Sequence, residues 1–338
     1  MDDSSALAVT TTSPDTAVLV LQSGGPDTTR HVRRFIRRML SDRAILAMPG
    51  AVRIPLAAAI ALFRAPRVGR QYARIGGGSP IRKHTEAQAA RLEEALLRLG
   101  HALPVLVGMR YSDPSIEAAV ERVRRMGGIR ELVLLPLFPQ YSGTTTGSAF
   151  AAVERAARDV PGLRLVPIPD WADERRYAEA VAGTIDTALS RLTLRGRRRP
   201  VVLFSAHGLP VRYVEDGDPY PDRVAATVRA VEEAMGDAMP RHSVCYQSRL
   251  GPVKWLEPNT HDAILAAAAE GASAVVLVPI AFVCDHLETL YEMDVEYRAV
   301  AEGAGVEFAR APALNDSAEL ATALAAVVVR ALHRQGGA

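Results

Sequence analysis

The chain has 338 residues, more than a typical single domain, so its length predicts two units of roughly 150 residues. Hydrophobic residues make up 49% and charged residues 23%, which is ordinary for a globular protein with a sizeable core. The formal net charge of +2 lacks the strong basic excess of nucleic-acid-binding proteins, so we expect no nucleic-acid partner.

The N-terminal residues 1–16 are polar and acidic. They lack the basic start and apolar core of a signal peptide, and we interpret them as a disordered tail. The most apolar run, residues 54–63, is too short to span a bilayer. These features predict a cytoplasmic protein in which the two cysteines, Cys245 and Cys284, are free thiols.

Several apolar runs are each followed by a turn and a segment of helical periodicity, and we expect them to be strands. They are residues 17–21, 104–109, 131–137, 164–169, 200–206, 242–247 and 274–281. Each run is apolar on both faces, as parallel strands covered by helices on both sides must be. Strands that alternate with helices predict an α/β fold with doubly wound parallel sheets.

The two halves of the chain resemble each other. Residues 104–110 are similar to residues 200–207, and residues 133–139 are similar to residues 276–282. A duplicated domain would place the loops that follow the strands on the two sides of an interdomain cleft, where open α/β sheets usually bind ligands.

The expected domain boundaries follow from this repeat. A turn near residues 170–173 divides the chain into a first domain, 17–172, and a second domain, 173–315. Residues 316–338 form a final helix whose apolar stripe could pack back on the first domain.

His207 stands where the predicted strand 200–206 ends and the chain turns. Catalytic groups lie at the ends of parallel strands in such folds. An imidazole at this position can take up protons near neutral pH or bind a borderline metal such as Fe²⁺. The alternative is a structural histidine that is hydrogen-bonded to the loop backbone.

Four acidic residues follow the predicted strand 274–281 at spacings of three, four and four, namely Asp285, Glu288, Glu292 and Glu296. On an α-helix they would share one face. Such a stripe is either a solvated helix surface or a path of oxygen ligands that attracts a divalent cation. In the second interpretation the path leads to Glu288, the glutamate nearest the end of the strand.

Three further segments could bind a ligand. Residues 74–80 contain three successive glycines, but they lack the ending of a P-loop and the spacing of a dinucleotide fingerprint, so nucleotide binding is not expected. Arg110 could hold a carboxylate in a bidentate pair. Trp255 could stack on a flat ring or be a buried structural tryptophan.

With these residues in view, the chain resembles the ferrochelatase family along nearly its whole length. Nine segments occur in the family's order and at about its spacing, namely residues 21–27, 41–43, 75–80, 108–111, 139–142, 205–210, 217–220, 246–249 and 285–292. The resemblance implies two Rossmann-like domains of the chelatase type that bind no nucleotide. It also implies a lyase that inserts Fe²⁺ into a porphyrin, the last step of heme biosynthesis.

The same resemblance implies roles for individual residues. His207 and Glu288 are the expected catalytic residues and the expected ligands of the incoming Fe²⁺. Glu292 and Glu296, together with Asp285 from the acidic stripe, are expected to line the path for the metal or the departing protons. In the family this segment is often a π-helix. The expected contacts of the porphyrin are Ser23, Arg110, Tyr111, Ser142 and Trp255.

Departures from the family pattern add further expectations. Metazoan relatives carry an iron–sulfur cluster, which is not expected here because Gly143 replaces one ligand and the C-terminus holds no cysteine. Fe²⁺ is then a substrate, and no tightly bound cofactor is expected. Residues 44–64 match the mobile lip over the pocket, which with Arg53, Arg64 and Arg67 could touch a membrane surface, such as the inner membrane. We expect a monomer.

The sequence leaves the substrate open. Residues 246–258 resemble enzymes that use protoporphyrin IX more than enzymes that use coproporphyrin III. The chain could also be a chelatase for cobalt or nickel, or a tetrapyrrole- or metal-binding protein without turnover. The presence of both His207 and Glu288 favours catalysis.

Overall fold

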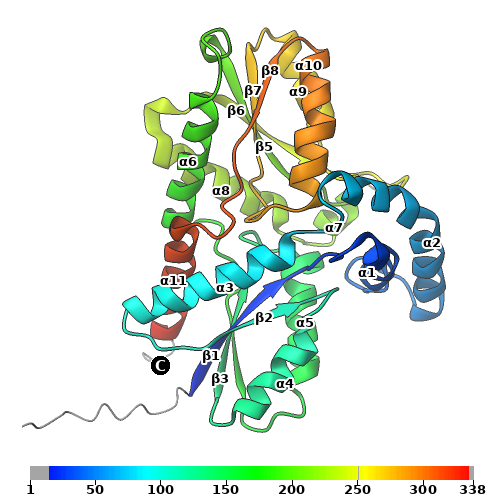
Figure 1. Ribbon diagram of the computed structural model, residues 1–338, viewed down its shortest axis with the longest axis vertical. Coiled ribbons are helices and arrows are strands. Elements are labelled where there is room, and N and C mark those ends of the chain that lie inside the picture. The colour runs from blue at the N-terminus through cyan, green and yellow to red at the C-terminus, as the bar shows by residue number, and fades with distance from the viewer. Residues whose placement is uncertain (1–14, 250, 335–338) are drawn as a thin grey trace, which may run out of the picture.

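The computed structural model describes residues 15–249 and 251–334. It contains two parallel four-stranded sheets, placed one above the other along the long axis of the molecule (Figure 1). The α/β fold predicted from the sequence is confirmed. Most of the predicted N-terminal tail lies outside the described residues, and the first strand begins at Thr16.

The first sheet has the strand order β2-β1-β3-β4. Its strands are β1 (Thr16–Gln22), β2 (Val105–Met109), β3 (Glu131–Pro136) and β4 (Arg164–Pro167). The accompanying helices are α3 (Ile81–Arg98), α4 (Ile116–Met126) and α5 (Ser148–Ala157). Alternate residues of β1 enter separate apolar clusters on the two faces: Val18 and Val20 join the cluster of α3, and Leu19 and Leu21 join that of α4 and α5. Both faces are therefore covered, as the continuous apolar runs require.

The second sheet has the strand order β6-β5-β7-β8. Its strands are β5 (Pro200–His207), β6 (Arg241–Gln247), β7 (Ala274–Val278) and β8 (Glu307–Arg310). The accompanying helices are α6 (Arg175–Ser190), α8 (Tyr220–Met235), α9 (Thr260–Ala269) and α10 (Arg298–Gly303). In β5, Val202 and Phe204 join the cluster of α6 and α8, whereas Val201 and Leu203 join that of α9.

Short helical elements connect these layers. Two are π-helices, η2 (Gly143–Gly147) and the longer η5 (Glu288–Tyr297). The others are η1 (Thr29–His31), η3 (Gly196–Arg198), α7 (Val211–Glu215) and η4 (Gly236–Ala238).

The two sheets share one topology, because each places its first strand in the middle and its second strand at an edge. The predicted match of residues 133–139 with 276–282 is therefore confirmed, since β3 and β7 occupy the same place. The predicted match of 104–110 with 200–207 is wrong: β2 is an edge strand equivalent to β6, and β5 is equivalent to β1. Buried parallel strands share one apolar composition, so sequence similarity alone does not identify which strands correspond.

The last helix, α11 (Ala318–His333), packs against α3, β3 and α6 (Figure 1). Its buried side chains belong to one apolar cluster that also contains residues of both sheets, including Val133 of β3 and Val276 of β7. Arg330 pairs with Glu174, which caps the N-terminus of α6. Helix α11 thus joins the two halves.

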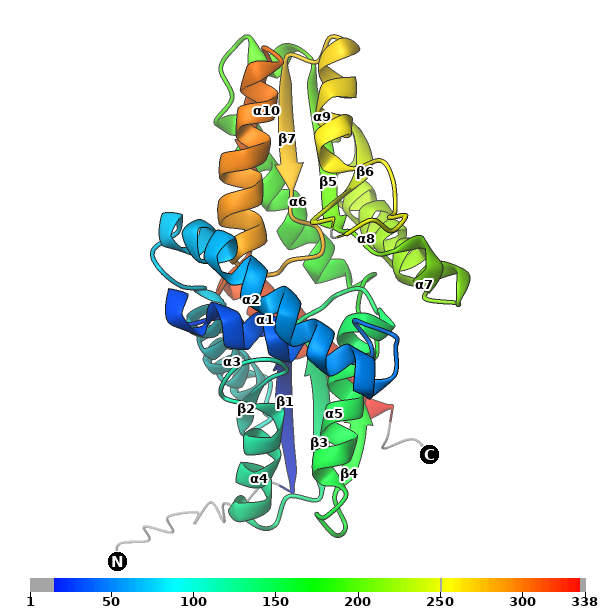
Figure 2. The same cartoon turned by 90° about the vertical axis from the view of Figure 1, so that its right-hand side faces the viewer.

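A pair of helices, α1 (Val32–Leu40) and α2 (Gly50–Arg74), projects from one side of the molecule. The pair lies across the level at which the two sheets meet (Figure 2) and has an apolar cluster of its own. The predicted lip, 44–64, is thus the loop before α2 and its first part, and the helix continues to Arg74. Among the described helices, none is long and apolar enough to cross a membrane.

Candidate active site

His207 is the last residue of β5 and lies beside Gln247, its neighbour in register on β6. Its Nδ1 lies 2.7 Å from the carbonyl oxygen of Gly208. Because a carbonyl oxygen can only accept, Nδ1 carries the hydrogen, and Nε2 keeps a free lone pair. The half-buried ring can therefore accept a proton or bind a metal through Nε2.

Gly208 allows this turn to form. A Cβ atom at this position would lie 2.7 Å from the carbonyl oxygen of Gln247 and 3.2 Å from Cε3 of Trp255. The backbone nitrogen of Gly208 donates to the same carbonyl oxygen at 2.7 Å. Trp255, predicted to contact the porphyrin, thus lies next to the turn that carries His207. Its Nε1 is buried without a hydrogen-bond partner among the described residues.

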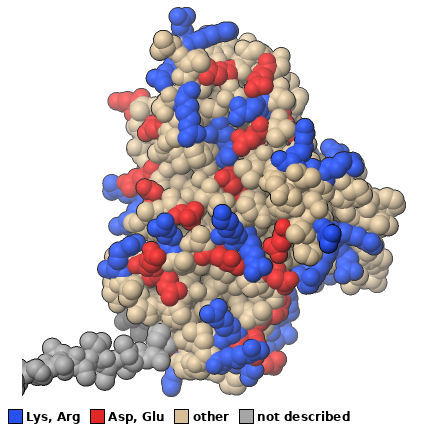
Figure 3. Space-filling view, in the orientation of Figure 1, with Lys and Arg blue, Asp and Glu red and all other residues tan. Residues whose placement is uncertain are grey.

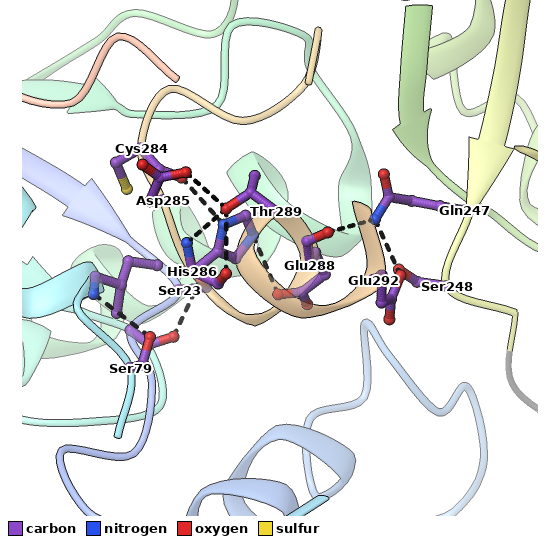
Figure 4. A network of polar contacts seen from close by, with 12 residues as sticks. Ser23, Ser79, Gln247, Ser248, Cys284, Asp285, His286, Glu288, Thr289 and Glu292 are labelled. Atoms are coloured by element: carbon purple, nitrogen blue, oxygen red, sulfur yellow. Dashed lines mark hydrogen bonds and ion pairs between the residues drawn. The ribbon is translucent and has the colours of Figure 1, made fainter. Parts of the chain in front are cut away.

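The π-helix η5 carries Glu288 at its first residue and Glu292 one turn later. The π-helix that the family resemblance implied is confirmed. In a helix with hydrogen bonds from residue i to i+5, residues four apart still lie on one side. Figure 4 shows the Glu292 carboxylate joined to Gln247 and Ser248, and the Glu288 carboxylate joined to His286.

Gln247 connects the two predicted parts of the site. Its buried Nε2 donates to the backbone oxygen of Glu288 at 3.1 Å and to Oε2 of Glu292 at 3.0 Å. Its Oε1 accepts from Ser205 Oγ at 2.8 Å. Sequence reasoning did not select Gln247, although it belongs to a family-like segment, 246–249. The amide fixes the acidic helix against the strand end that bears His207.

His286 is a second residue that the predictions missed. Its Nε2 lies 3.2 Å from Oε2 of Glu288, with both side chains partly buried. The ring of Phe282 lies edge-on to both His286 and His207, at centroid distances of 4.6 and 6.3 Å. The motif of residues 285–292 contains this histidine, which was the available signal. The Phe282 ring therefore contacts both imidazoles, and His286 is the one that meets Glu288.

Burial and the neighbouring Glu288 carboxylate raise the pKa of Glu292 to about 7, although Ser248 and Gln247 donate to it. The Arg64 guanidinium of α2 is close enough for its charge to be felt by Glu292. A carboxyl group that titrates near neutral pH can bind either a proton or a metal ion under physiological conditions.

This raised pKa predicts how stability changes with pH. The unfolded chain releases the Glu292 proton near 4.5, whereas the folded protein keeps it to about 7. Between these values the folded state binds more protons, so stability falls as the pH rises, and the full cost is present above pH 7. We expect Glu292→Gln to raise the melting temperature at pH 8 by about 2–5 °C and by less at pH 5. The exposed Glu296→Gln is the matched control in calorimetry, and an equal gain at both pH values would contradict the assignment.

Asp285 does not share the helical face predicted for the four acids, because the π-helix begins after it, at Glu288. Its carboxylate accepts from Thr289 Oγ1 and Asn315 Nδ2, both at 2.9 Å, and pairs with Arg310. Burial alone would raise the pKa of Asp285, but Arg310, Asn315 and Thr289 together lower it. Figure 4 shows Asp285 and Glu292 at opposite ends of the group, and Glu296 is exposed on the third turn.

Arg110 and Tyr111 follow β2 and share one partner, Asp42. Arg110 Nη2 lies 2.7 Å from Oδ2 of Asp42, and the Tyr111 hydroxyl donates to the same oxygen at 2.8 Å. Ser148 donates to it as well. Burial alone would raise the pKa of Asp42, but Ser148, the backbone nitrogen of Ala44 and Arg110 lower it. Asp42 was not predicted, although its segment, 41–43, belongs to the family pattern.

Ser23 and Ser142 complete the predicted porphyrin contacts. Ser23 follows β1, and its backbone oxygen accepts from Tyr111 N at 3.0 Å, so Ser23, Arg110 and Tyr111 lie together. Ser142 is buried and caps η2, and its hydroxyl donates to Oδ2 of Asp218 at 2.9 Å. Asp218 comes from the second half of the chain, so this bond connects the loops of the two sheets.

Comparisons with known proteins identify the family of the chain. The family model of ferrochelatases matches residues 15–332. The chain belongs to the ferrochelatase family. It is 44% identical over 323 residues to a ferrochelatase of Thermosynechococcus vestitus, covering 94% of this chain and 82% of that protein. A ferrochelatase of Desulfotalea psychrophila is 39% identical over 316 residues, covering 93% and 96% of the two chains.

Solved structures show the fold of this ferrochelatase family member in more distant proteins. SirB from Bacillus subtilis with Fe³⁺ superimposes with a TM-score of 0.56 at 13% identity, covering 95% of this chain and 97% of that one. The sirohydrochlorin chelatase SirB from B. subtilis subspecies spizizenii with cobalt gives a TM-score of 0.54 at 14% identity, with the same coverage. The predicted chelatase-type architecture is confirmed, whereas the roles of individual residues stay predictions.

Proposed function

We propose that this chain inserts Fe²⁺ into protoporphyrin IX to form protoheme, the last step of heme biosynthesis. The observation that carries the proposal is the amide bridge of Gln247, which joins the strand end bearing His207 to the helix bearing Glu288 and Glu292. Membership of the ferrochelatase family, whose model matches residues 15–332, supports it.

The proposed chemistry assigns a task to each group. Metal insertion replaces two pyrrole N–H protons by one Fe²⁺, and the metal loses its water ligands. His207 accepts a proton at Nε2, the nitrogen that its contact with Gly208 leaves free. Glu288 provides a carboxylate for the incoming ion. His286, whose Nε2 lies 3.2 Å from Oε2 of Glu288, can take up a proton. Arg110 and Tyr111, whose side chains meet Asp42 in this structure, are the proposed contacts of a porphyrin carboxylate.

The function is tested by mixing the purified protein anaerobically with Fe²⁺ and each porphyrin in turn, and following the absorption of the metallated product. Protoporphyrin IX is expected to give the higher kcat/KM. Faster turnover of coproporphyrin III would assign the chain to that substrate. Porphyrin binding without product would make it a carrier, and preferential use of cobalt or nickel in a competition assay would change the metal.

Substitutions of Glu292 and Glu296 are expected to affect the use of Fe²⁺ to different degrees. Glu292 is half-buried and hydrogen-bonded to Gln247, whereas Glu296 is exposed. We expect Glu292→Gln to raise the KM for Fe²⁺ by about tenfold, a size typical of groups around a metal ligand, and Glu296→Gln to raise it less. The KM for the porphyrin should stay within a factor of about two. Equal effects on both KM values would favour a solvated helix surface.

We propose that Fe²⁺ acts as a substrate only, without a resident iron–sulfur cluster. Burial raises the pKa of the Cys245 thiol to about 11 and that of Cys284 further. Protonated thiols are poor metal ligands, because the thiolate is the ligand form. Iron and acid-labile sulfide analysis of the purified protein is expected to find neither at one equivalent.

The proposed location is cytoplasmic, with the monomer touching a membrane through α2. Five apolar side chains of this helix are more than a third exposed, namely Val52, Ile54, Leu56, Leu62 and Phe63. Figure 3 shows arginines and lysines around this projecting, otherwise uncharged surface. Apolar side chains bordered by cations are typical of peripheral contact with anionic lipid.

Vesicle sedimentation tests this contact. The protein is expected to sediment with vesicles that contain phosphatidylglycerol, and Phe63→Ser, at a side chain that is 81% exposed, is expected to weaken binding. Failure of the unchanged protein to sediment would exclude the contact. Light scattering after gel filtration is expected to report one chain.

A further inference from the structure

The π-helix η5 contains three glutamates and one aspartate within 10 residues. Like charges on neighbouring turns of a helix repel each other. π-Helical hydrogen bonding is also rare and occurs mostly in single turns at functional sites. Contacts from outside the helix must therefore stabilise it.

Arg310 at the end of β8 makes two such contacts. Its Nη1 lies 3.1 Å from Oδ1 of Asp285, and its Nε lies 2.9 Å from Oδ1 of Asp294. The arginine side chain is only 12% exposed. The guanidinium of Arg310 thus pairs with Asp285, which precedes the helix, and with Asp294, which lies in its second turn.

This bridge depends on the way the chain enters the helix. In a continuous α-helix, residues nine apart are about 13 Å apart along the axis, which is further than one guanidinium can reach. Asp285 and Asp294 can meet the same arginine because residues 281–286 are not helical, so Asp285 does not continue the axis of η5.

The side of η5 that carries these contacts borders an open cavity of about 640 Å³. Asp285, Asp294, Arg298 and Arg310 are among its lining residues. The two ion pairs of Arg310 therefore contact η5 on the side that borders this cavity.

Asp285 links Arg310 to Thr289, the residue that follows Glu288. Oδ1 of Asp285 accepts from Thr289 Oγ1 at 2.9 Å, and Asn315 bonds both its backbone nitrogen and its Oδ2. Asn315 is itself held by Gln88 of α3, in the first half of the chain, through a bond of 2.7 Å. Figure 4 shows Asp285 joined to Thr289 at the start of the helix that carries Glu288.

We infer that Arg310 is a positioning residue that fixes the π-helix so that Glu288 and Glu292 are placed to receive the metal. In this role Arg310 acts through its ion pairs with Asp285 and Asp294. The inference rests on the proposed function, because it assigns a role in the use of the metal at the same site.

The test compares Arg310→Met with Arg310→Lys. We expect Arg310→Met to raise the KM for Fe²⁺ by about tenfold, as the loss of groups that orient metal ligands commonly does, with the porphyrin KM within about twofold. Lysine keeps the charge but cannot pair with both aspartates in the same way. The KM for Fe²⁺ of Arg310→Lys should therefore lie between those of Arg310→Met and the unchanged protein. Calorimetric titration with Co²⁺, an air-stable divalent probe, should show the same order of affinities.

Arg298→Met is the matched control. Arg298 stacks on Phe308 and lies 4.0 Å from Asp294, in the same cavity, but does not reach Asp285. Its substitution should change neither the metal KM nor the Co²⁺ affinity by more than about twofold. Asp294→Asn, which removes only the ion pair between Arg310 and Asp294, provides a second variant if Arg310→Met does not fold.

A folded Arg310→Met, or Asp294→Asn in its place, with an unchanged metal KM and Co²⁺ affinity would overturn the inference, whatever its melting temperature. Equal increases in both substrate KM values would also overturn it, since they would indicate general loosening. If the unchanged protein inserts no metal, the proposed function fails, and the Co²⁺ titrations alone still decide whether Arg310 positions the acids.

Discussion

Replacing His207 by alanine is expected to lower kcat for metal insertion by about 10²–10⁴-fold, the usual contribution of a positioned acid or base. The reason lies in the ring nitrogens, because Gly208 accepts from Nδ1 and leaves Nε2 free. Porphyrin binding, measured by quenching of porphyrin fluorescence, should change by no more than a few-fold. Anaerobic insertion assays supply the rate.

His242→Ala is the control for this substitution. His242 is also a half-buried histidine of the second sheet, on β6, but both of its nitrogens have partners, Pro240 and Glu232. Its ring lies edge-on to Phe204 at 5.8 Å, so its removal affects packing without touching the site. Near-normal turnover of His207→Ala, or equal losses in the two variants, would reject His207 as the catalytic base.

Trp171→Ala should destabilise the fold by about 3–5 kcal/mol, the cost of removing a large buried aromatic side chain. Trp171 is 1% exposed and belongs to the cluster that joins the two sheets. Its Nε1 donates to the carbonyl oxygen of Pro136 at 2.8 Å, and its ring lies edge-on to Tyr177 at 5.0 Å. Urea denaturation measures the loss.

Two further variants separate the contributions of Trp171. Trp171→Phe keeps most of the apolar area and loses the hydrogen bond, so it should cost about 1–3 kcal/mol. Leu194→Ala, at a side chain that is 85% exposed, should cost under about 0.5 kcal/mol. A Trp171→Ala midpoint equal to that of Leu194→Ala would show that this residue does not join the halves.

The apolar runs predicted most of the sheet strands, because a strand buried on both faces has a nearly continuous apolar sequence. β8, residues Glu307–Arg310, escaped prediction since it is short and carries charge at both ends. One of the two predicted matches between the halves, that of residues 104–110 with 200–207, was wrong for a related reason. Composition identifies a buried strand, but hydrogen-bonding partners and edge positions are set by tertiary contacts.

The site was predictable where it lies within one motif. His207 at a strand end and Glu288 with Glu292 on a helix follow from local sequence, and the family resemblance implied the π-helix. The role of Gln247 depends on the register of β5 with β6, and that of Asp42 depends on the contact between α1's end and β2. Such long-range pairings leave no local periodicity that a single sequence could reveal.

During synthesis the first half of the chain leaves the ribosome with one face of its sheet incompletely covered. The helix that covers this face together with α3 is α11, which is translated after every other described helix and strand. Until then, Val133 and Leu135 of β3 lack the apolar partners that bury them in the finished protein. Exposed apolar strands favour aggregation of nascent chains. We therefore expect the first half to be prone to aggregation until α11 has been made and has packed on β3.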